Sequence, residues 1–361
     1  MQGGESESRM HAERDRRGRE TEPGDDQAEP RGGLSMQKSL LGILAAAAVL
    51  TGYPVAASAV EWNFFHHQSA PQFATSRGAR MLAEEIEKST NGGLKVKLHL
   101  SGTLQISPTN VTSAVAGGVV QLGDDLFNSG NIPVAGIPRL PGLVQSYEEF
   151  AKAADALRPY LHKAFAEKGL VVLGEYTYPL QVVWGKKKIA SLDDIKGLKL
   201  RVAQPEQGEM VRRFGGTSIT ISAPEVPAAL DRGVVDGIFT AGVGAVLWKD
   251  LLKFGYLVPV NWNNSYFIAN ADAYKALSPD LQQKLRAAAE KMARWNQDTM
   301  RQEEAESVKT LTAAGFTLTR ATPEAAAKVA ETMKPYWDEW AKSRGPQVVE
   351  ALAKVRAALG R

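Results

Sequence analysis

Arg201 is the residue of this sequence best suited to bind a carboxylate. It stands in the segment 191–240, where 191–194 predicts a helix cap and first turn, Gly197 predicts a stop, and 198–202 alternates as a short strand. The arginine therefore lies at the end of a predicted strand. A guanidinium there can offer two parallel donors to a carboxylate, which a lysine cannot do. A solvated surface arginine is the alternative interpretation.

The histidines give little indication of a metal site. The chain has five of them, at positions 11, 66, 67, 99 and 162, and only His66 and His67 are adjacent. Neighbouring side chains of an extended backbone point to opposite faces, so we expect these two not to share a metal ion. The sequence predicts no metal and no other cofactor.

Two pairs of adjacent carboxylates could in principle serve acid–base catalysis, Asp124 with Asp125 and Asp193 with Asp194. The second pair falls in a predicted first helical turn, where negative charge stabilises the helix dipole. Asp236, followed by a glycine, is typical of a turn at the end of a strand. Because the sequence contains no HExxH, GxSxG or Walker motif, we do not expect an enzyme.

The elements that must position Arg201 alternate between strands and helices. Strands are predicted at 61–65, 94–100, 119–122, 170–173, 180–184, 198–202, 217–221 and 234–238, and helices at 73–88, 110–116, 206–214, 224–232, 278–312 and, with a break at 345–346, from 322 to 359. Parallel sheets of this kind bind ligands outside the carboxyl ends of their strands. The loops that follow the strands are therefore expected to carry the function.

Composition sets the broad class of the protein. The 361 residues are 44% hydrophobic and 23% charged, which suits a globular chain with a substantial core. The net charge of +3 is too small and too dispersed for a nucleic-acid-binding face. The absence of cysteine excludes a disulfide framework, a thiolate nucleophile and cysteine-ligated metals.

The N-terminal part of the sequence predicts export. Residues 1–35 are too polar to pack a core and are interpreted as a disordered extension or a mis-assigned start. The segment 36–59 has the order of a secretory signal peptide: the positive Lys38, an apolar run at 40–50 and small residues at its end. The apolar run is short for a permanent membrane span. We therefore expect a periplasmic protein whose mature chain begins at Val60.

Three blocks of the sequence resemble the periplasmic solute-binding subunits of tripartite ATP-independent periplasmic (TRAP) transporters, the DctP-type family. They are DIKGLKLRV at 194–202, AALDRGVVDG at 228–237 and YFIANADAYKALSPDLQQKL at 266–285. The resemblance covers nearly all of residues 60–361. It implies transport rather than catalysis, and it implies small and large integral membrane subunits as partners that use an ion gradient.

The resemblance also implies a fold. It is an α/β fold of the periplasmic binding protein type, with two lobes, crossing strands and a long spanning helix, which closes over a small organic acid. Lobe I is expected at 60–180 and 266–305, and lobe II at 181–265 and 306–361. A ligand-binding receptor that feeds a signalling system would use the same fold, and a secreted enzyme on this fold is the less favoured alternative.

The site residues that the resemblance implies begin with Arg201, the arginine that bridges to the substrate carboxylate. The matching position on the crossing strand, often polar or basic in the family, is Gln181, or Val183 if the register shifts by two. A neutral residue there favours a monocarboxylate, because a second buried anion would have no partner. Phe239 and Thr240 stand where the family often has an asparagine, which favours an aromatic or branched ligand.

Further residues are expected to complete the walls of the site, although large aromatic side chains equally often form the core. They are His67, Gln68, Asp125, Leu126, Phe127, Trp184, Trp262, Asn263 and Tyr266.

Overall fold

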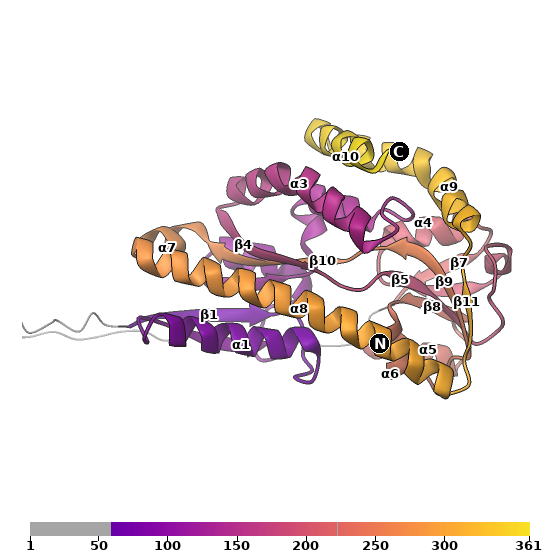
Figure 1. Cartoon of the computed structure of the whole chain (residues 1–361), viewed down its shortest axis with the longest axis horizontal. Helices are drawn as coiled ribbons and strands as arrows, with labels where there is room; N and C mark the ends of the chain where they lie inside the picture. The colour runs from indigo at the N-terminus through magenta and orange to yellow at the C-terminus, as the bar shows by residue number, and fades with distance from the viewer. Residues whose placement is uncertain (1–58, 222) are drawn as a thin grey trace, which may run out of the picture. The chain divides into compact units, whose positions relative to one another are not determined.

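The computed structural model describes residues 59–361 apart from 222. The predicted extension at 1–35 and the predicted signal segment up to residue 58 lie outside the described residues. Figure 1 shows the arrangement of the helices and strands.

Five strands form the first sheet, in the order β2-β1-β3-β10-β4. They are β1 (Val60–His66), β2 (Leu94–Leu100), β3 (Leu122–Asp125), β4 (Leu170–Thr177) and β10 (Asn264–Asn270). β1 runs parallel to β2 and β3, whereas β10 is antiparallel to β3 and β4. Phe64 of β1 is fully buried and packs edge-on against Phe267 of β10, with 6.1 Å between ring centroids.

Six strands form the second sheet, in the order β11-β9-β5-β8-β6-β7. They are β5 (Gln181–Gly185), β6 (Lys199–Val202), β7 (Thr217–Thr220), β8 (Gly237–Thr240), β9 (Phe254–Asn261) and β11 (Thr317–Arg320). β6 is parallel to both β7 and β8, so their carboxyl ends meet at one edge of the sheet. Arg201, on β6, lies next to that edge.

The chain passes between the two sheets where β4 leads to β5 and where β9 leads to β10. The two connections are hydrogen-bonded to each other, because the Tyr178 amide donates to the Asn263 carbonyl at 2.7 Å and Gln181 pairs with Asn261. The 35-residue helix α8 (Pro279–Ala313) packs against β4 and α1 (Ala74–Ser89) of the first sheet and against α6 (Gly242–Leu247) beside the second (Figure 1).

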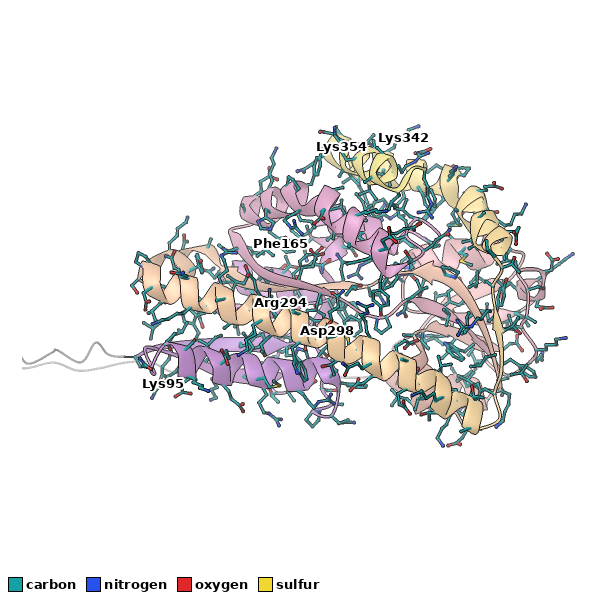
Figure 2. The ribbon with its side chains drawn as sticks, in the orientation of Figure 1. Lys95, Phe165, Arg294, Asp298, Lys342 and Lys354 are labelled. Carbon is teal, nitrogen blue, oxygen red and sulfur yellow. The ribbon has the colours of Figure 1, made fainter. Side chains whose placement is uncertain are left out.

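The other helices cover the sheets and fill the space around the connections. They are α2 (Val111–Ala116), α3 (Tyr147–Glu167), α4 (Pro205–Arg213), α5 (Val226–Asp231), α7 (Ala271–Ala276), α9 (Pro323–Lys342) and α10 (Pro346–Leu359). Phe165 of α3, labelled in Figure 2, packs its ring 5.1 Å from that of Tyr266 in β10. Among residues 59–361, no helix is long and apolar enough to cross a membrane.

Several predicted elements agree with the structure, but two strand positions were wrong. The strand at 94–100 and the long helix at 278–312 are confirmed almost to the residue. β3 and β8 each begin three residues later than predicted. Val119 and Val234 look like strand residues, but both follow a glycine with positive φ and are 65% and 44% exposed.

The shift of these two strands changes the role of the residues in them. Asp124 and Asp125 belong to β3 and are buried within it, rather than lying in the loop that follows. Gly237 begins β8, so the preceding Asp236 introduces a strand rather than ending one.

Candidate functional site

Arg201 is a buried cation that has no counter-charge among the residues that the structure describes. Its side chain is almost enclosed, with 6% of the residue exposed. Nε donates to the Ile221 carbonyl at 2.8 Å, and Nη1 donates to the Phe239 carbonyl at 3.4 Å. No carboxylate of the described residues forms an ion pair with it, and burial lowers its pKa to about 10. A guanidinium has five N–H donors, so donors remain for an anion.

A chain of amide side chains lies next to Arg201 along the sequence. The Ala203 backbone N–H donates to Gln207 Oε1 at 2.9 Å, and Gln207 Nε2 donates to Asn261 Oδ1 at 2.9 Å. Asn263 Oδ1 then accepts from Asn261 Nδ2 at 3.3 Å and from Gln204 Nε2 at 2.6 Å. These contacts join the start of α4 to the connection between β9 and β10.

Three predicted residues, His67, Gln68 and Phe127, follow strands β1 and β3 of the first sheet. His67 Nδ1 donates to the Asp124 carbonyl at 3.0 Å, and Nε2 accepts from the Tyr178 hydroxyl at 2.8 Å. Burial lowers the pKa of His67 to about 4 in spite of the nearby Asp124, so the imidazole is neutral at pH 7. Gln68 lies near the Tyr178 hydroxyl and opposes the rise of its pKa that burial causes. Phe127 is 37% exposed and meets His67 edge-on, at 6.4 Å between ring centroids.

Asp124 is a fully buried carboxylate that is surrounded by donors. It accepts hydrogen bonds from the Tyr176 hydroxyl at 2.8 Å, from Ser265 Oγ at 2.6 Å and from His66 Nδ1 at 2.8 Å. Burial by itself would raise the pKa of Asp124, but the two imidazoles and these hydrogen bonds outweigh burial and lower it. The negative charge is therefore stabilised within the fold.

His66, His67 and Asp124 are the described residues that could hold a metal ion, with one donor atom from each lying within 4.8 Å of the others. The prediction that the two histidines point apart is wrong, because the extended backbone ends at His66 and bends at His67, leaving ring centroids 4.6 Å apart. Nδ1 of each histidine already hydrogen-bonds an oxygen of Asp124. Both Nδ1 atoms are therefore engaged in hydrogen bonds within the cluster, whereas Nε2 of His66 has no hydrogen-bond partner among the described residues.

Asp125 and Arg139 form a second buried charged group beside this cluster. Burial raises the pKa of Asp125 to about 7, although a hydrogen bond from Thr112 and the charge of Arg139 oppose the rise. Arg139 donates to the carbonyls of Leu126 and Asn264. Unlike Arg201, this guanidinium has carboxylates close enough to oppose the lowering of its pKa by burial.

Four other predicted residues, Gln181, Trp184, Phe239 and Thr240, lie on β5 and β8 in the sheet that holds Arg201, but not all as accessible side chains. Gln181 is buried, and its Nε2 donates to the Pro179 carbonyl at 2.9 Å. Trp184 and Phe239 are fully buried in apolar clusters, and Trp184 Nε1 donates to the Thr240 carbonyl at 3.0 Å. Thr240 is half-buried. Arg201 thus meets the backbone of Phe239 rather than its ring.

The residues of this region that were not predicted as part of the site include Tyr178, Gln204, Gln207, Asn261 and Asp124. A signal for Gln204 was present in the sequence, because a proline at the first position of a helix places the preceding residue at the N-cap. That N-cap directly follows the strand of Arg201. No comparable local signal marked Tyr178 or Asp124, whose partners come from distant segments.

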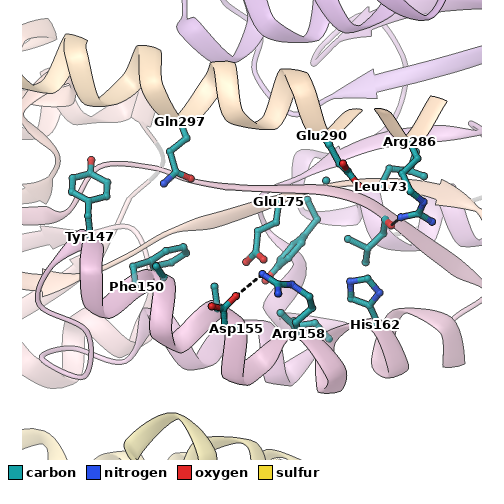
Figure 3. Close-up of a pocket in the computed structure, with 16 residues that line it drawn as sticks. Tyr147, Phe150, Asp155, Arg158, His162, Leu173, Glu175, Arg286, Glu290 and Gln297 are labelled. Atoms are coloured by element: carbon teal, nitrogen blue, oxygen red, sulfur yellow. Dashed lines mark hydrogen bonds and ion pairs between the residues drawn. The ribbon is translucent and has the colours of Figure 1, made fainter. Parts of the chain in front are cut away.

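A separate cavity of about 390 Å³ lies between α3, β4 and α8 (Figure 3). Glu175, whose pKa burial raises to about 7, points into it near Arg158, which forms an ion pair with Asp155 at 2.7 Å. Of the residues predicted for the site only Tyr266 lines this cavity, so it is distinct from the region around Arg201.

Comparison with known proteins gives consistent results. The family model for bacterial extracellular solute-binding proteins of family 7, DctP, matches residues 65–343. A C4-dicarboxylate-binding periplasmic protein of Rhodobacter capsulatus is 26% identical over 309 residues, which are 81% of this chain and 90% of the relative. A solute-binding protein of Albidiferax ferrireducens is 24% identical over 175 residues, 48% of this chain and about half, 52%, of that relative.

A solved structure supports the same assignment. An extracytoplasmic solute receptor of Bordetella pertussis that binds pyroglutamic acid is 27% identical, covers 82% of this chain and 100% of its own, and superposes with a TM-score of 0.74. The predicted α/β two-lobe fold is therefore confirmed, and the relatives are solute receptors rather than enzymes. The chain belongs to the DctP family of bacterial extracellular solute-binding proteins, the solute receptors of TRAP transporters.

Proposed function

We propose that this chain is the periplasmic receptor of a TRAP transporter for a small organic monocarboxylate, and that Arg201 binds the carboxylate. The observation that supports this proposal is the buried guanidinium, 6% exposed, which has no ion-pair partner among the described residues. An unpaired buried charge is costly, and a ligand carboxylate would compensate it. The predicted signal peptide at 36–59 supports the periplasmic location, and small and large membrane subunits would complete the transporter.

The groups around Arg201 favour one carboxylate over two. Gln181, Gln204 and Asn263 are neutral amides, and the pKa of about 4 keeps His67 uncharged at pH 7. A second carboxylate of the ligand would therefore meet no cation among these side chains. The R. capsulatus relative binds C4-dicarboxylates, whereas the B. pertussis receptor binds pyroglutamic acid, which has one carboxylate. The neutral side chains around Arg201 support a ligand with one carboxylate.

The body of the ligand is proposed to be compact and polar. The rings of Trp184 and Phe239 are fully buried in apolar clusters, so the exposed Phe127 is the predicted aromatic contact that remains accessible. Amide, hydroxyl and imidazole groups make up the other side chains at the connections. This composition supports a small cyclic or hydroxylated acid over a large aromatic one.

Thermal shift and calorimetric titration with pyroglutamate and succinate test the proposal. We expect pyroglutamate to raise the melting temperature and succinate to bind more weakly, since ligand binding stabilises the folded state. Arg201→Gln should weaken pyroglutamate binding at least about 100-fold, because it removes one partner of a buried charge pair. The exposed Arg320→Gln is the matched control and should bind normally. Unchanged affinity in Arg201→Gln would refute the central role of this residue, and tighter binding of succinate would refute the preference for one carboxylate.

A further inference from the structure

We infer that Gln204 selects acids that carry an N–H or O–H donor next to the carboxylate, because the amide chain leaves Gln204 Oε1 as a buried acceptor with no partner among the described residues. This inference rests on the proposed function. It concerns the series of hydrogen bonds that leads from Ala203 through the side chains of Gln207, Asn261 and Asn263 to Gln204. The direction of these bonds decides which group a ligand must present to Gln204.

The direction is set at one end by the backbone. The Ala203 N–H can only donate, so the atom of Gln207 that faces it must be the oxygen. The nitrogen of Gln207 then donates to Asn261, and Asn261 must present its oxygen. Gln207 and Asn261 are both fully buried, so water does not compete for these positions.

The same logic continues to Gln204. The nitrogen of Asn261 faces Asn263, so Asn263 presents Oδ1, and that oxygen also receives Gln204 Nε2 at 2.6 Å. The orientation of each amide thus follows from that of the amide before it, and Gln204 Oε1 is the last atom of the hydrogen-bonded series. Gln204 is 9% exposed, and its Oε1 has no hydrogen-bond partner among the residues that the structure describes.

The position of Gln204 places this acceptor near the proposed carboxylate site. Arg201 is the last but one residue of β6, and Gln204, three residues later, is the N-cap of α4. Ligands of such folds bind outside the carboxyl ends of the strands, which is where this connection runs. A donor on the atom next to the ligand carboxylate would satisfy Oε1, whereas a keto or ring oxygen there would leave two acceptors facing each other.

The class of ligand follows from this requirement. Lactam acids, N-acyl amino acids and 2-hydroxy acids carry the required donor. 2-Oxo acids and lactone acids of the same size do not. A site that hydrogen-bonds a ligand donor rejects analogues without it far more strongly than an apolar pocket rejects a change in size.

Two matched pairs of acids test the inference by calorimetric titration of the purified protein. The first pair is pyroglutamate and 5-oxotetrahydrofuran-2-carboxylate, which differ only in a ring N–H replaced by oxygen. The second pair is lactate and pyruvate. In each pair we expect the donor-bearing acid to bind about 10- to 100-fold more tightly. Gln204→Met, which removes the acceptor but keeps the length of the side chain, should reduce that ratio to about threefold or less.

A second variant tests the direction of the chain rather than the presence of Gln204. In Gln207→Glu the introduced carboxyl, when ionised, still accepts from Ala203 but can no longer donate to Asn261. Because burial raises the pKa of a carboxyl, the pairs of acids are compared in this variant at about pH 8.5, where the carboxyl is ionised. Asn261 and Asn263 would then reverse their amides in turn, and Gln204 would offer Nε2 instead of Oε1. The preference within each pair should therefore invert, even if the added negative charge weakens the binding of both acids. A variant that only disturbed the structure would not invert it.

The outcomes separate this inference from the proposed function. If Arg201→Gln abolishes binding but the unchanged protein binds both members of a pair equally, or prefers the donor-free acid, the inference is wrong and the proposed function stands. If binding does not depend on Arg201, the proposed function is wrong. If none of the four acids binds at millimolar concentration, the ligand class inferred from Gln204 is wrong, and the role of Arg201 is then decided with other monocarboxylates.

Discussion

Each of the two sheets holds a buried charge near the connections between them, and the fold treats the two charges differently. Asp124, in the first sheet, accepts hydrogen bonds from Tyr176, Ser265 and His66. Arg201, in the second sheet, donates to two backbone carbonyls and has no counter-charge among the described residues. One charge is compensated by the protein itself, and the other is the charge that we propose binds the ligand.

We expect this difference to distinguish a charge that stabilises the fold from a charge that binds a ligand. A buried carboxylate with several donors stabilises the arrangement of the segments that supply them. A buried guanidinium without a counter-charge lowers the stability of the unliganded protein, and an anion that pairs with it regains that free energy on binding. The comparison predicts that removing the two charges changes the free energy of unfolding in opposite directions.

The largest effect is expected for Asp124→Ala. The substitution leaves the donors of Tyr176, Ser265 and His66 buried without their acceptor, so the free energy of unfolding should fall by about 4 kcal/mol. Urea denaturation followed by circular dichroism measures the loss.

The matched control for Asp124→Ala is Asp250→Ala, which changes a carboxylate that is 92% exposed. This variant should stay within about 0.5 kcal/mol of the unchanged protein. A loss at Asp124 no larger than the loss at Asp250 would contradict the view that Asp124 organises the first sheet.

The next effect concerns Asp125, which adjoins Asp124 in β3 but has a pKa raised by burial to about 7. An unfolded aspartate has a pKa of about 3.9, so the folded state binds the additional proton between these two values. The contribution of Asp125 to stability is therefore present at pH 4 and is lost as the pH rises through 7. Asp125→Asn should become more stable relative to the unchanged protein across this interval, by on the order of 3 kcal/mol.

The difference between the two proteins at each pH is the quantity to measure, because other groups titrate in the same interval. Glu175, whose pKa burial raises to about 7, changes stability in the same direction as Asp125. His67, whose pKa burial lowers to about 4, contributes stability that is lost as the pH falls from 6.5 to 4. Both are present in both proteins and cancel. A difference that does not change between pH 4.5 and 7.5 would show that Asp125 titrates normally.

Elements with local signals could be predicted from the sequence. The strand at 94–100 alternates in polarity, and the long helix begins at Ser278, whose side chain accepts from the Leu281 amide as an N-cap. The position of Arg201 was predicted from the short alternating strand that follows Gly197, and the structure confirms a strand there.

The Asp124 cluster could not be predicted, because its partners are brought together only by the tertiary fold. His66, Tyr176 and Ser265 come from β1, β4 and β10, and nothing in the sequence near residue 124 indicates them. The positions of Val119 and Val234 were mispredicted for a related reason, since strand propensity does not show which valines the sheet buries. The sequence around Arg201 thus indicated the charge that we propose binds the ligand, whereas the sequence around Asp124 did not indicate its buried hydrogen-bond partners.

The smallest effect, and the one of opposite sign, is expected for Arg201→Met in the absence of ligand. Methionine removes the uncompensated charge and fills a similar volume, so the free energy of unfolding should rise by about 1 kcal/mol while carboxylate binding is lost. The gain is small because the carbonyls of Ile221 and Phe239 lose their donor. Urea denaturation of the ligand-free protein measures it.

Arg139→Met is the matched control for Arg201→Met, because it removes a guanidinium that is equally buried but lies near the carboxylate of Asp125. It should lower the free energy of unfolding by about 3 kcal/mol, since the carbonyls of Leu126 and Asn264 and the neighbouring carboxylate lose a partner. If Arg201→Met destabilised the ligand-free protein as much as Arg139→Met, both arginines would be structural. Opposite signs at the two positions would identify Arg201 as the charge that the fold holds for its ligand.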